Sequence, residues 1–296
     1  MQTKQQIQQL LTSVGISPNK RLGQHFLIDL NLMRLLVDAA HIGNNDIVLE
    51  VGCGTGSLTE ALADKAGKVI AVELDESLAK IARRKVATAK NVEVMNTDIL
   101  ETKSIVSQAV TDALELARDE YRGRLLLVAN LPYNAACPLM VNLVIGPTKA
   151  DGMYVTVQKQ VADRMIASPG CGDYGNLSIL LNVTGDVKII RVLRPTVFWP
   201  RPQVDSAMVG FVRKKHKAAR IKNMKLFSEV VNLFMGHRRK VLKSCTKFAQ
   251  GRLAQIGDWQ NIFEHLFIDP RSRPEQVPPG AYIAIANLCS DRLNQK

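Results

Sequence analysis

Four consecutive residues, Asn130-Leu131-Pro132-Tyr133, follow a strand-like apolar run at residues 125–129. In a parallel α/β sheet, ligands bind at the carboxyl ends of the strands. A neutral amide, a backbone carbonyl before a proline and an aromatic ring are therefore expected at the edge where chemistry occurs. None of these side chains is a strong base or nucleophile. The set suits a planar, neutral and weakly nucleophilic amine better than it suits hydrolysis.

The exocyclic amine of adenine is such a group, because its lone pair is delocalised into the ring. Two acceptors, the side-chain oxygen of Asn130 and the carbonyl of Leu131, can hold its two N–H groups so that the nitrogen pyramidalises. Pro132 biases Leu131 toward extended backbone and has no N–H to compete. Tyr133 offers a ring face on which a base can stack. The alternatives are that Asn130 caps the following helix and that Tyr133 belongs to the core.

A second group of residues lies at the ends of earlier strands. The run from Glu50 to Gly56, with glycines at every second position, follows a strand and opens a helix. Glycine permits the tight turn and close ligand approach, and the helix amides beyond it offer donors to an anionic group. Glu73 ends the next strand, where an acid accepts ribose hydroxyls. Asp98 follows the third strand and is placed to accept from an adenine amino group.

This combination is typical of class I S-adenosylmethionine-dependent methyltransferases. The rival class is the nicotinamide-dependent enzymes, which use a related glycine loop. Their Tyr-x-x-x-Lys pair does not follow here, and the glycine spacing differs from theirs.

The elements that must position these groups alternate along the chain. Alternating strands and helices with short turns predict βαβ units and a parallel sheet, and hence an α/β fold. We expect strands at residues 46–51, 68–73, 91–95, 125–129, 153–158, 186–192 and 206–212. We expect helices at residues 1–15, 31–42, 57–66, 76–87, 103–121, 135–145 and 176–183. Helical spacing of apolar residues continues at 227–234 and 241–248.

The β signal fades after the run Arg213-Lys-Lys-His-Lys. We therefore predict an N-terminal extension at residues 1–19, a methyltransferase domain at 20–213 and a helical, basic domain at 214–296.

The positive charge is concentrated in one segment. The chain has 39 Lys and Arg against 27 Asp and Glu, a formal net charge of +12. Residues 201–252 hold 14 of the basic side chains and only two acidic ones, so this segment accounts for the whole excess. A concentrated basic face indicates a polyanionic partner, most simply nucleic acid. The alternative is a solvated helical face without a partner.

Several other classes are disfavoured. No apolar run is long enough for a membrane span, and the N-terminus lacks a secretory signal, so we expect no membrane association and a cytoplasmic protein. The five cysteines are widely spaced, with no metal-ligand pattern and no sign of a disulfide framework. We expect no metal.

Several motifs occur together in order. They are Gly23-Gln24-His25-Phe26-Leu27, the glycine loop, Asn130–Tyr133, Phe198-Trp-Pro-Arg-Pro-x-Val-Asp-Ser-Ala207, His237-Arg-Arg-Lys-Val241 and Arg273-Pro-Glu. From about residue 20 to the C-terminus the chain resembles the small-subunit ribosomal RNA adenine dimethyltransferases. The resemblance implies a Rossmann-like methyltransferase sheet with helices on both faces, followed by a small all-α domain.

The resemblance also implies a reaction. Methyl groups pass from S-adenosylmethionine to N6 of two adjacent adenosines in the 3′-terminal hairpin loop of 16S rRNA, within the immature small ribosomal subunit. We expect a monomer. The alternatives are an RNA-binding assembly or transcription factor of the same fold, or a 23S rRNA adenine methyltransferase. A small-molecule methyltransferase is disfavoured by the basic segment.

The residue patterns and the resemblance together give three sets of site residues. Carried over by position, the cofactor contacts fall on His25, Leu27, Gly52, Gly54, Glu73, Asp98 and Asn130. The catalytic set is Asn130, Leu131, Pro132, Tyr133 and Phe198, with Phe198 closing the opposite face of the base. The RNA contacts are Arg238, Arg239, Lys240, Lys243 and Lys247.

Some of these assignments have alternatives. His25 alone is more often structural than functional, and Phe198-Trp199 between prolines is typical of a rigid packing loop. The segment between Asp98 and Asn130 is longer than usual for the family, which affects local contacts near the adenine of the cofactor.

Overall fold

The computed structural model describes residues 1–19 and 22–294. The start of the predicted methyltransferase domain, residues 20 and 21, and the last two residues lie outside this part of the chain. Within the described chain, contacts separate two compact units. The first comprises residues 1–162 and 188–212, and the second comprises residues 163–187 and 213–296. Residues 163–187 thus join the C-terminal helices in one unit, and the predicted domain division remains a prediction.

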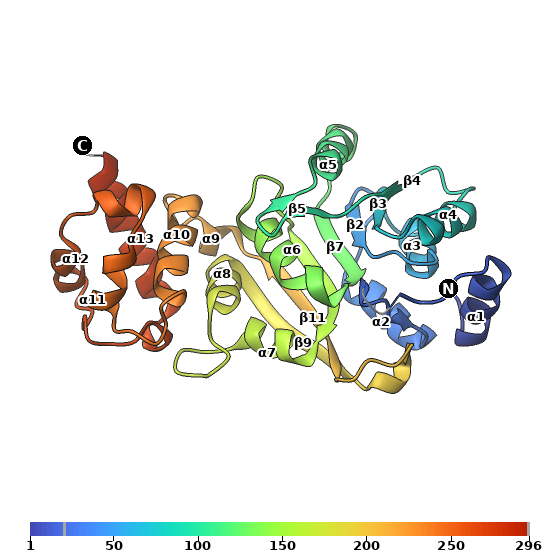
Figure 1. Cartoon of the computed structure of the whole chain (residues 1–296). Helices are drawn as coiled ribbons and strands as arrows, with labels where there is room; N and C mark the ends of the chain where they lie inside the picture. Colours follow the sequence, from blue (N-terminus) through green and yellow to red (C-terminus); the bar gives the residue numbers. More distant parts are fainter. Residues whose placement is uncertain (20–21, 295–296) are drawn as a thin grey trace. The chain divides into compact units, whose positions relative to one another are not determined.

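The main sheet is mixed and, within the described residues, has seven strands (Figure 1). Their spatial order is β4 (Val92–Asn96), β3 (Lys68–Glu73), β2 (Ile47–Val51), β7 (Leu125–Asn130), β8 (Gly152–Gln158), β11 (Ser206–Arg213) and β9 (Gly185–Leu193). Neighbouring strands from β4 to β8 run parallel, whereas β11 is antiparallel to β8. Each of the strands predicted from the sequence is present.

The strand order reverses between β2 and β7. From β2 the chain proceeds outward through β3 to β4, and β7 then lies on the other side of β2. In open α/β sheets, ligands bind at such a switch point, beyond the carboxyl ends of the strands. The two strands at this point end in the glycine loop and in Asn130-Leu131-Pro132-Tyr133.

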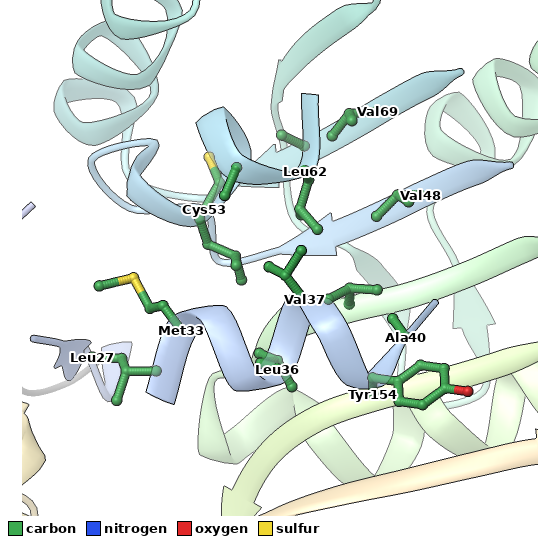
Figure 2. Close-up of a cluster of buried hydrophobic side chains, with 14 of the residues drawn as sticks. Leu27, Met33, Leu36, Val37, Ala40, Val48, Cys53, Leu62, Val69 and Tyr154 are labelled. Atoms are coloured by element: carbon green, nitrogen blue, oxygen red, sulfur yellow. The ribbon is translucent and has the colours of Figure 1, made fainter. Parts of the chain in front are cut away.

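Helices cover both faces of the sheet. Strands β2 and β7 are buried along nearly their whole length, as expected for parallel strands packed on both sides. Figure 2 shows Leu36 and Val37 of α2, and Ala40 just after it, in one cluster with Val48 of β2. Helices α5 and α6 contact β2, β3 and β8 as well. The bounds are α1 (Lys4–Ser13), α2 (Leu30–Ala39), α3 (Ser57–Ala63), α4 (Glu76–Lys85), α5 (Gln108–Glu120), α6 (Tyr133–Ile145) and α7 (Lys159–Ile166).

The helix expected at residues 103–121 is shorter than predicted. Its first turn is replaced by a hairpin of β5 (Leu100–Thr102) and β6 (Ile105–Val106). The amide of Ser104 donates to the hydroxyl of Thr102, which stabilises the turn. Such local bonds from Thr and Ser compete with helix formation. Helix α5 then begins at Gln108.

The second unit is mainly helical. Phe234 is buried at its centre, with ring centroids 5.9 Å from Trp259 and 6.1 Å from Tyr282. The helix expected at residues 241–248 is a short α-helix followed by a 3₁₀ turn. The helices are α8 (Asn176–Thr184), α9 (Lys215–Ala218), α10 (Met224–Met235), α11 (Leu242–Cys245), α12 (Trp259–His265) and α13 (Pro279–Asn294). The 3₁₀ turns are η3 (Thr246–Phe248), η4 (Gly251–Gln255) and η5 (Pro274–Gln276).

Among the residues that the structure describes, no helix is long and apolar enough to cross a membrane.

Candidate active site

A cavity of about 400 Å³ lies at the carboxyl ends of β2, β3 and β7 in the first unit. Its volume is within the range of small-molecule sites. The predicted cofactor and base-holding residues converge on it from separate parts of the chain. Its lining includes His25, Leu27, Gly52, Gly54, Glu73, Asp98, Asn130, Leu131, Pro132 and Tyr133.

The glycine loop approaches its neighbours too closely for any side chain. Gly52 and Gly54 have φ angles of +75° and +57°, in the left-handed region that favours glycine. A Cβ added at Gly52 would lie 2.9 Å from Cγ of Pro132, and one at Gly54 would lie 2.9 Å from Cε1 of Phe26. Gly52 therefore allows the cofactor loop to pack directly against the Asn130–Tyr133 segment.

Glu73 is buried and held by backbone amides. Its Oε2 accepts from the amide of Gly54 at 2.8 Å, and its Oε1 accepts from the amide of Asp75 at 3.0 Å. A carboxylate has about four acceptor positions, so each oxygen keeps one for a ribose hydroxyl. Burial raises the pKa of Glu73 above its usual range, and the backbone donors partly offset this.

Asp98, in contrast, is exposed at the edge of the cavity. Its Oδ1 accepts from the amide of Leu100 at 2.9 Å, which fixes the carboxylate at the end of β4. This placement is compatible with the predicted contact to the adenine amino group.

Glu50 is a site residue for which the sequence predicted no role. It lines the cavity, is 2% exposed, and its Oε2 has no hydrogen-bond partner among the described residues. Burial raises the pKa of this carboxyl to about 8, and the neighbouring charge of Glu73 contributes. A buried acid beside a ligand cavity favours a cationic ligand, because the ligand would supply the missing charge partner. Its position directly before the glycine turn is the sequence feature that could have identified Glu50 as a site residue.

The amide of Asn130 is oriented by two neighbours. Its Nδ2 donates to the carbonyl of His25 at 2.7 Å, and its Oδ1 accepts from the hydroxyl of Thr156. Only the NH₂ group can donate to a carbonyl, so these bonds settle which way the amide points. Oδ1 keeps one lone pair. Thr156 was not predicted as a site residue, since its contact with Asn130 depends on the register of β7 and β8.

Tyr133 opens α6 and is also held in place. Its hydroxyl is 2.9 Å from Oγ of Ser206, and its ring centroid is 5.5 Å from that of His25. Burial raises the pKa of the Tyr133 hydroxyl. Nδ1 of His25 lies 2.7 Å from the carbonyl of Pro200, which can only accept, so Nδ1 donates this bond and the ring is held in place. Both rings line the cavity.

Phe198 does not join this group. It lies in β10 (Phe198–Trp199), which pairs with β1 (Phe26–Leu27), and Leu27 is its direct partner. It is 2% exposed and belongs to the same hydrophobic cluster as Leu27 and Met33. The prediction that its ring closes the far face of the base therefore finds no support in this geometry. The packing-loop alternative fits the observed burial.

The predicted RNA contacts differ among themselves. Arg238 donates to Glu275 at 2.9 Å and to the carbonyl of Gly172 at 3.0 Å, so it has a structural role within the second unit. The other predicted contacts are exposed, and the structure shows no ion pair for them with any residue that it describes. They are Arg239, Lys240, Lys243 and Lys247.

No group of His, Cys, Asp and Glu side chains in the described parts of the chain is arranged to hold a metal ion.

A family model described as ribosomal RNA adenine dimethylase matches residues 15–291. The chain belongs to this family. One relative is a "Ribosomal RNA small subunit methyltransferase A" from Caldanaerobacter subterraneus, which is 40% identical over 273 residues, covering 90% of this chain and 96% of the relative. A protein of the same name from Clostridium perfringens is 35% identical over 276 residues, covering 93% and 92%.

Solved structures show the same fold. A dimethyladenosine transferase from Plasmodium falciparum matches with a TM-score of 0.71 at 22% identity, covering 90% of this chain and 97% of that one. The 23S rRNA methyltransferase ErmE matches with a TM-score of 0.60 at 21% identity, covering 90% and 99%. The predicted family, the methyltransferase fold and the enzyme class are thereby confirmed.

The dimethylase uses S-adenosylmethionine, and its residues fit that cofactor. The glycine loop leaves a cradle that any side chain would fill, and Glu73 retains acceptors for a ribose. The unpartnered carboxyl of Glu50 is complementary to a ligand that carries positive charge. His25, Leu27, Gly52, Gly54, Glu73 and Asp98 are the residues that would hold it, and their individual roles remain predictions.

Replacing Gly52 by alanine should remove methyl transfer and weaken cofactor binding by about tenfold or more, because the added Cβ displaces Pro132. The matched control is Gly15→Ala. Gly15 has a similar φ of +71°, but its Cβ would meet nothing within 4 Å. Isothermal titration with the cofactor measures the effect. Equal losses in the two variants would attribute the effect to backbone strain rather than to packing on Pro132.

Replacing Glu50 by glutamine should change how stability depends on pH. The folded carboxyl, with a pKa of about 8, binds a proton that the unfolded chain loses near 4.5, so the wild type loses stability between those values. Glutamine does not titrate. The thermal midpoint of the cofactor-free variant, relative to wild type, should therefore rise between pH 5 and 8. The exposed Glu115→Gln on α5 is the control, and parallel curves for wild type and Glu50→Gln would contradict the prediction.

Proposed function

We propose that this dimethylase transfers methyl groups to N6 of two adjacent adenosines in the 3′-terminal hairpin loop of 16S rRNA. In this proposal it acts as a monomer on the immature small subunit, in the cytoplasm where subunits assemble. The observation that carries the proposal is the neutral acceptor set at the end of β7, which lines the same cavity as the cofactor residues. The small-subunit function of the relatives, at up to 40% identity among those compared, supports the choice of RNA.

The acceptors have the capacity that a primary amine requires. Oδ1 of Asn130 has one lone pair left beside the Thr156 hydroxyl. The carbonyl of Leu131 accepts no hydrogen bond from any described residue. These oxygens can accept the two N–H groups of the adenine amine. His25 and Thr156 hold the Asn130 amide in the orientation that presents its oxygen.

The cofactor supplies an electrophilic methyl group on a sulfonium when it is bound. The protein's task is to align the amine with that group and to exclude water, which can contribute roughly 7–11 kcal/mol relative to free encounter. Positive charge develops on N6 as it is methylated, and the oxygens of Asn130 and Leu131 stabilise it. The amine reacts in its neutral form and loses a proton to water afterwards. The site therefore requires no strong base.

The ring of Tyr133 offers a face on which the target base can stack. Stacking of a base on an aromatic ring contributes about 1–3 kcal/mol, and the Ser206 hydroxyl holds the ring in a fixed position. The target adenosine must leave its own stack to reach this face, as bases do in other base-modifying enzymes.

The exposed basic residues of the second unit would bind phosphates. Arg239, Lys240, Lys243 and Lys247 are available for this role. Arg238 contributes by tying its segment to Glu275 rather than by contacting RNA.

An RNA-binding factor without methyltransferase activity would have no need for the base-holding oxygens, the glycine loop that leaves room for a cofactor, and the buried acids Glu50 and Glu73 together. The likeness to ErmE concerns the fold and does not favour 23S rRNA. No observation supports a second function over the proposed one.

The decisive experiment is transfer of labelled methyl groups to small subunits that lack the modification, followed by digestion of the RNA. We expect N6,N6-dimethyladenosine in the 3′-terminal fragment of 16S rRNA. The Asn130→Ala variant should lose about 100-fold or more in kcat while its cofactor affinity changes by only a few fold. Thr156→Val, which leaves Asn130 in place but unsupported, should lose less. Label in 23S rRNA, or full activity of Asn130→Ala, would contradict the proposal.

Replacing Lys240, Lys243 and Lys247 by glutamine should weaken RNA binding and flatten its salt dependence. Each phosphate contact contributes about 0.7–0.9 to the slope of log K against log salt, so loss of all three should reduce the slope by about 2. Titration of labelled 16S rRNA at several salt concentrations measures this. The control is Lys65→Gln, Lys80→Gln and Lys90→Gln in the first unit, which removes the same charge. An equal change in both triple variants would show that only net charge matters.

A further inference from the structure

Phe267, in the second unit, is 97% exposed. Among the described residues it is the most exposed large hydrophobic one, ahead of Leu116 at 73%. Burying a phenylalanine is worth about 1.5–3 kcal/mol, and none of that gain is realised here. Core packing therefore does not account for an aromatic residue at this position.

The backbone does not account for it either. Phe267 follows the end of α12 with a φ of +54°. Its amide donates to the carbonyl of Glu264, and the next amide, that of Ile268, donates to the carbonyl of Phe263. This is the left-handed position that ends many helices, and it is usually glycine because a side chain is unfavourable there. The phenylalanine thus costs stability in the folded chain and recovers none by burial.

Two basic side chains lie in the structural neighbourhood of the segment that follows Phe267. The segment from Phe267 to Arg273 lies against α11, since the amides of Leu242 and Lys243 donate to the carbonyls of Ser272 and Pro270. The guanidinium of Arg271 is highly exposed and lies 3.4 Å from Asp269. The Arg271 amide, its guanidinium and the nearby Lys243 hold the pKa of Asp269 below its usual range. Arg271 and Lys243 thus lie near Asp269, two residues after the exposed ring of Phe267.

We propose that Phe267 is a stacking platform for an unpaired base of the ribosomal RNA substrate, with Arg271 and Lys243 binding the adjoining phosphates. Aromatic rings interleaved with basic side chains are how proteins hold single-stranded RNA. A ribosomal protein could also bind an exposed phenylalanine, but the basic side chains of Arg271 and Lys243 nearby favour a phosphate-bearing partner. The inference rests on the proposed function and adds a base contact outside the catalytic cavity.

The first test replaces Phe267 by glycine, the residue that best tolerates the left-handed backbone conformation at this position. Phe267→Gly should leave the thermal midpoint unchanged or raise it, because glycine adopts this φ freely. It should also weaken binding of immature small subunits by about tenfold or more. The loss should appear in KM for subunits rather than in kcat. A variant that is at least as stable as wild type but binds RNA less tightly is not explained by a structural role.

Two further variants separate stacking from apolar contact. Phe267→Trp keeps a ring and should bind as wild type does, whereas Phe267→Leu keeps an apolar side chain and should bind as Phe267→Gly does. Leu116→Ala, which removes an exposed side chain from α5 in the first unit, is the control and should have no effect. Wild-type affinity in Phe267→Gly would overturn the proposal, and wild-type affinity in Phe267→Leu would indicate an apolar contact instead.

A photo-reactive phenylalanine analogue at position 267 identifies the partner. Cross-linking to one region of 16S rRNA is the expected result, and cross-linking to a ribosomal protein would overturn the proposal. The binding and cross-linking assays do not depend on methyl transfer. Failure of the wild type to modify 16S rRNA would therefore count against the proposed function, whereas normal transfer with no role for Phe267 would count against this inference alone.

Discussion

The site depends on one close approach, that of the Gly52 backbone to the ring of Pro132. The loops after β2 and β7 meet there, at the point where the strand order reverses. One loop carries the residues proposed to hold the cofactor, and the other carries the oxygens proposed to hold the base. Because no side chain separates them, the methyl donor and the acceptor amine can share a single cavity. The buried acids, the Asn130 amide and the Tyr133 ring are all arranged around this contact.

Local patterns were enough to predict much of this arrangement. Apolar runs located the strands, and the glycine spacing located the cofactor loop, because both signals lie within a few consecutive residues. Contacts between residues far apart in the sequence could not be predicted from these local patterns. Thr156 meets Asn130 only through strand register, and Phe198 is drawn into the core by its pairing with Leu27. The Arg238–Glu275 pair likewise joins residues far apart in sequence, so a basic motif did not reveal which of its members was already engaged.

The two units place different demands on their residues. In the first, the carboxyl groups of Glu50 and Glu73 are buried although burial disfavours their charged forms. In the second, the exposed Phe267 adopts a backbone conformation that disfavours a side chain. Both are local costs that folding alone does not explain. Such costs tend to persist where they serve binding, which is why they identify functional positions.

The neutral acceptors at Asn130 and Leu131 also bear on how the reaction ends. An unmodified adenine offers them two N–H groups, a monomethylated base offers one, and a dimethylated base offers none. Each transfer thus removes one hydrogen bond and leaves a desolvated oxygen unsatisfied, at a cost of about 1–3 kcal/mol. If Asn130 and Leu131 hold the base as proposed, the affinity of the pocket for its base falls with every methyl group added. The acceptors would then favour release of the dimethylated product.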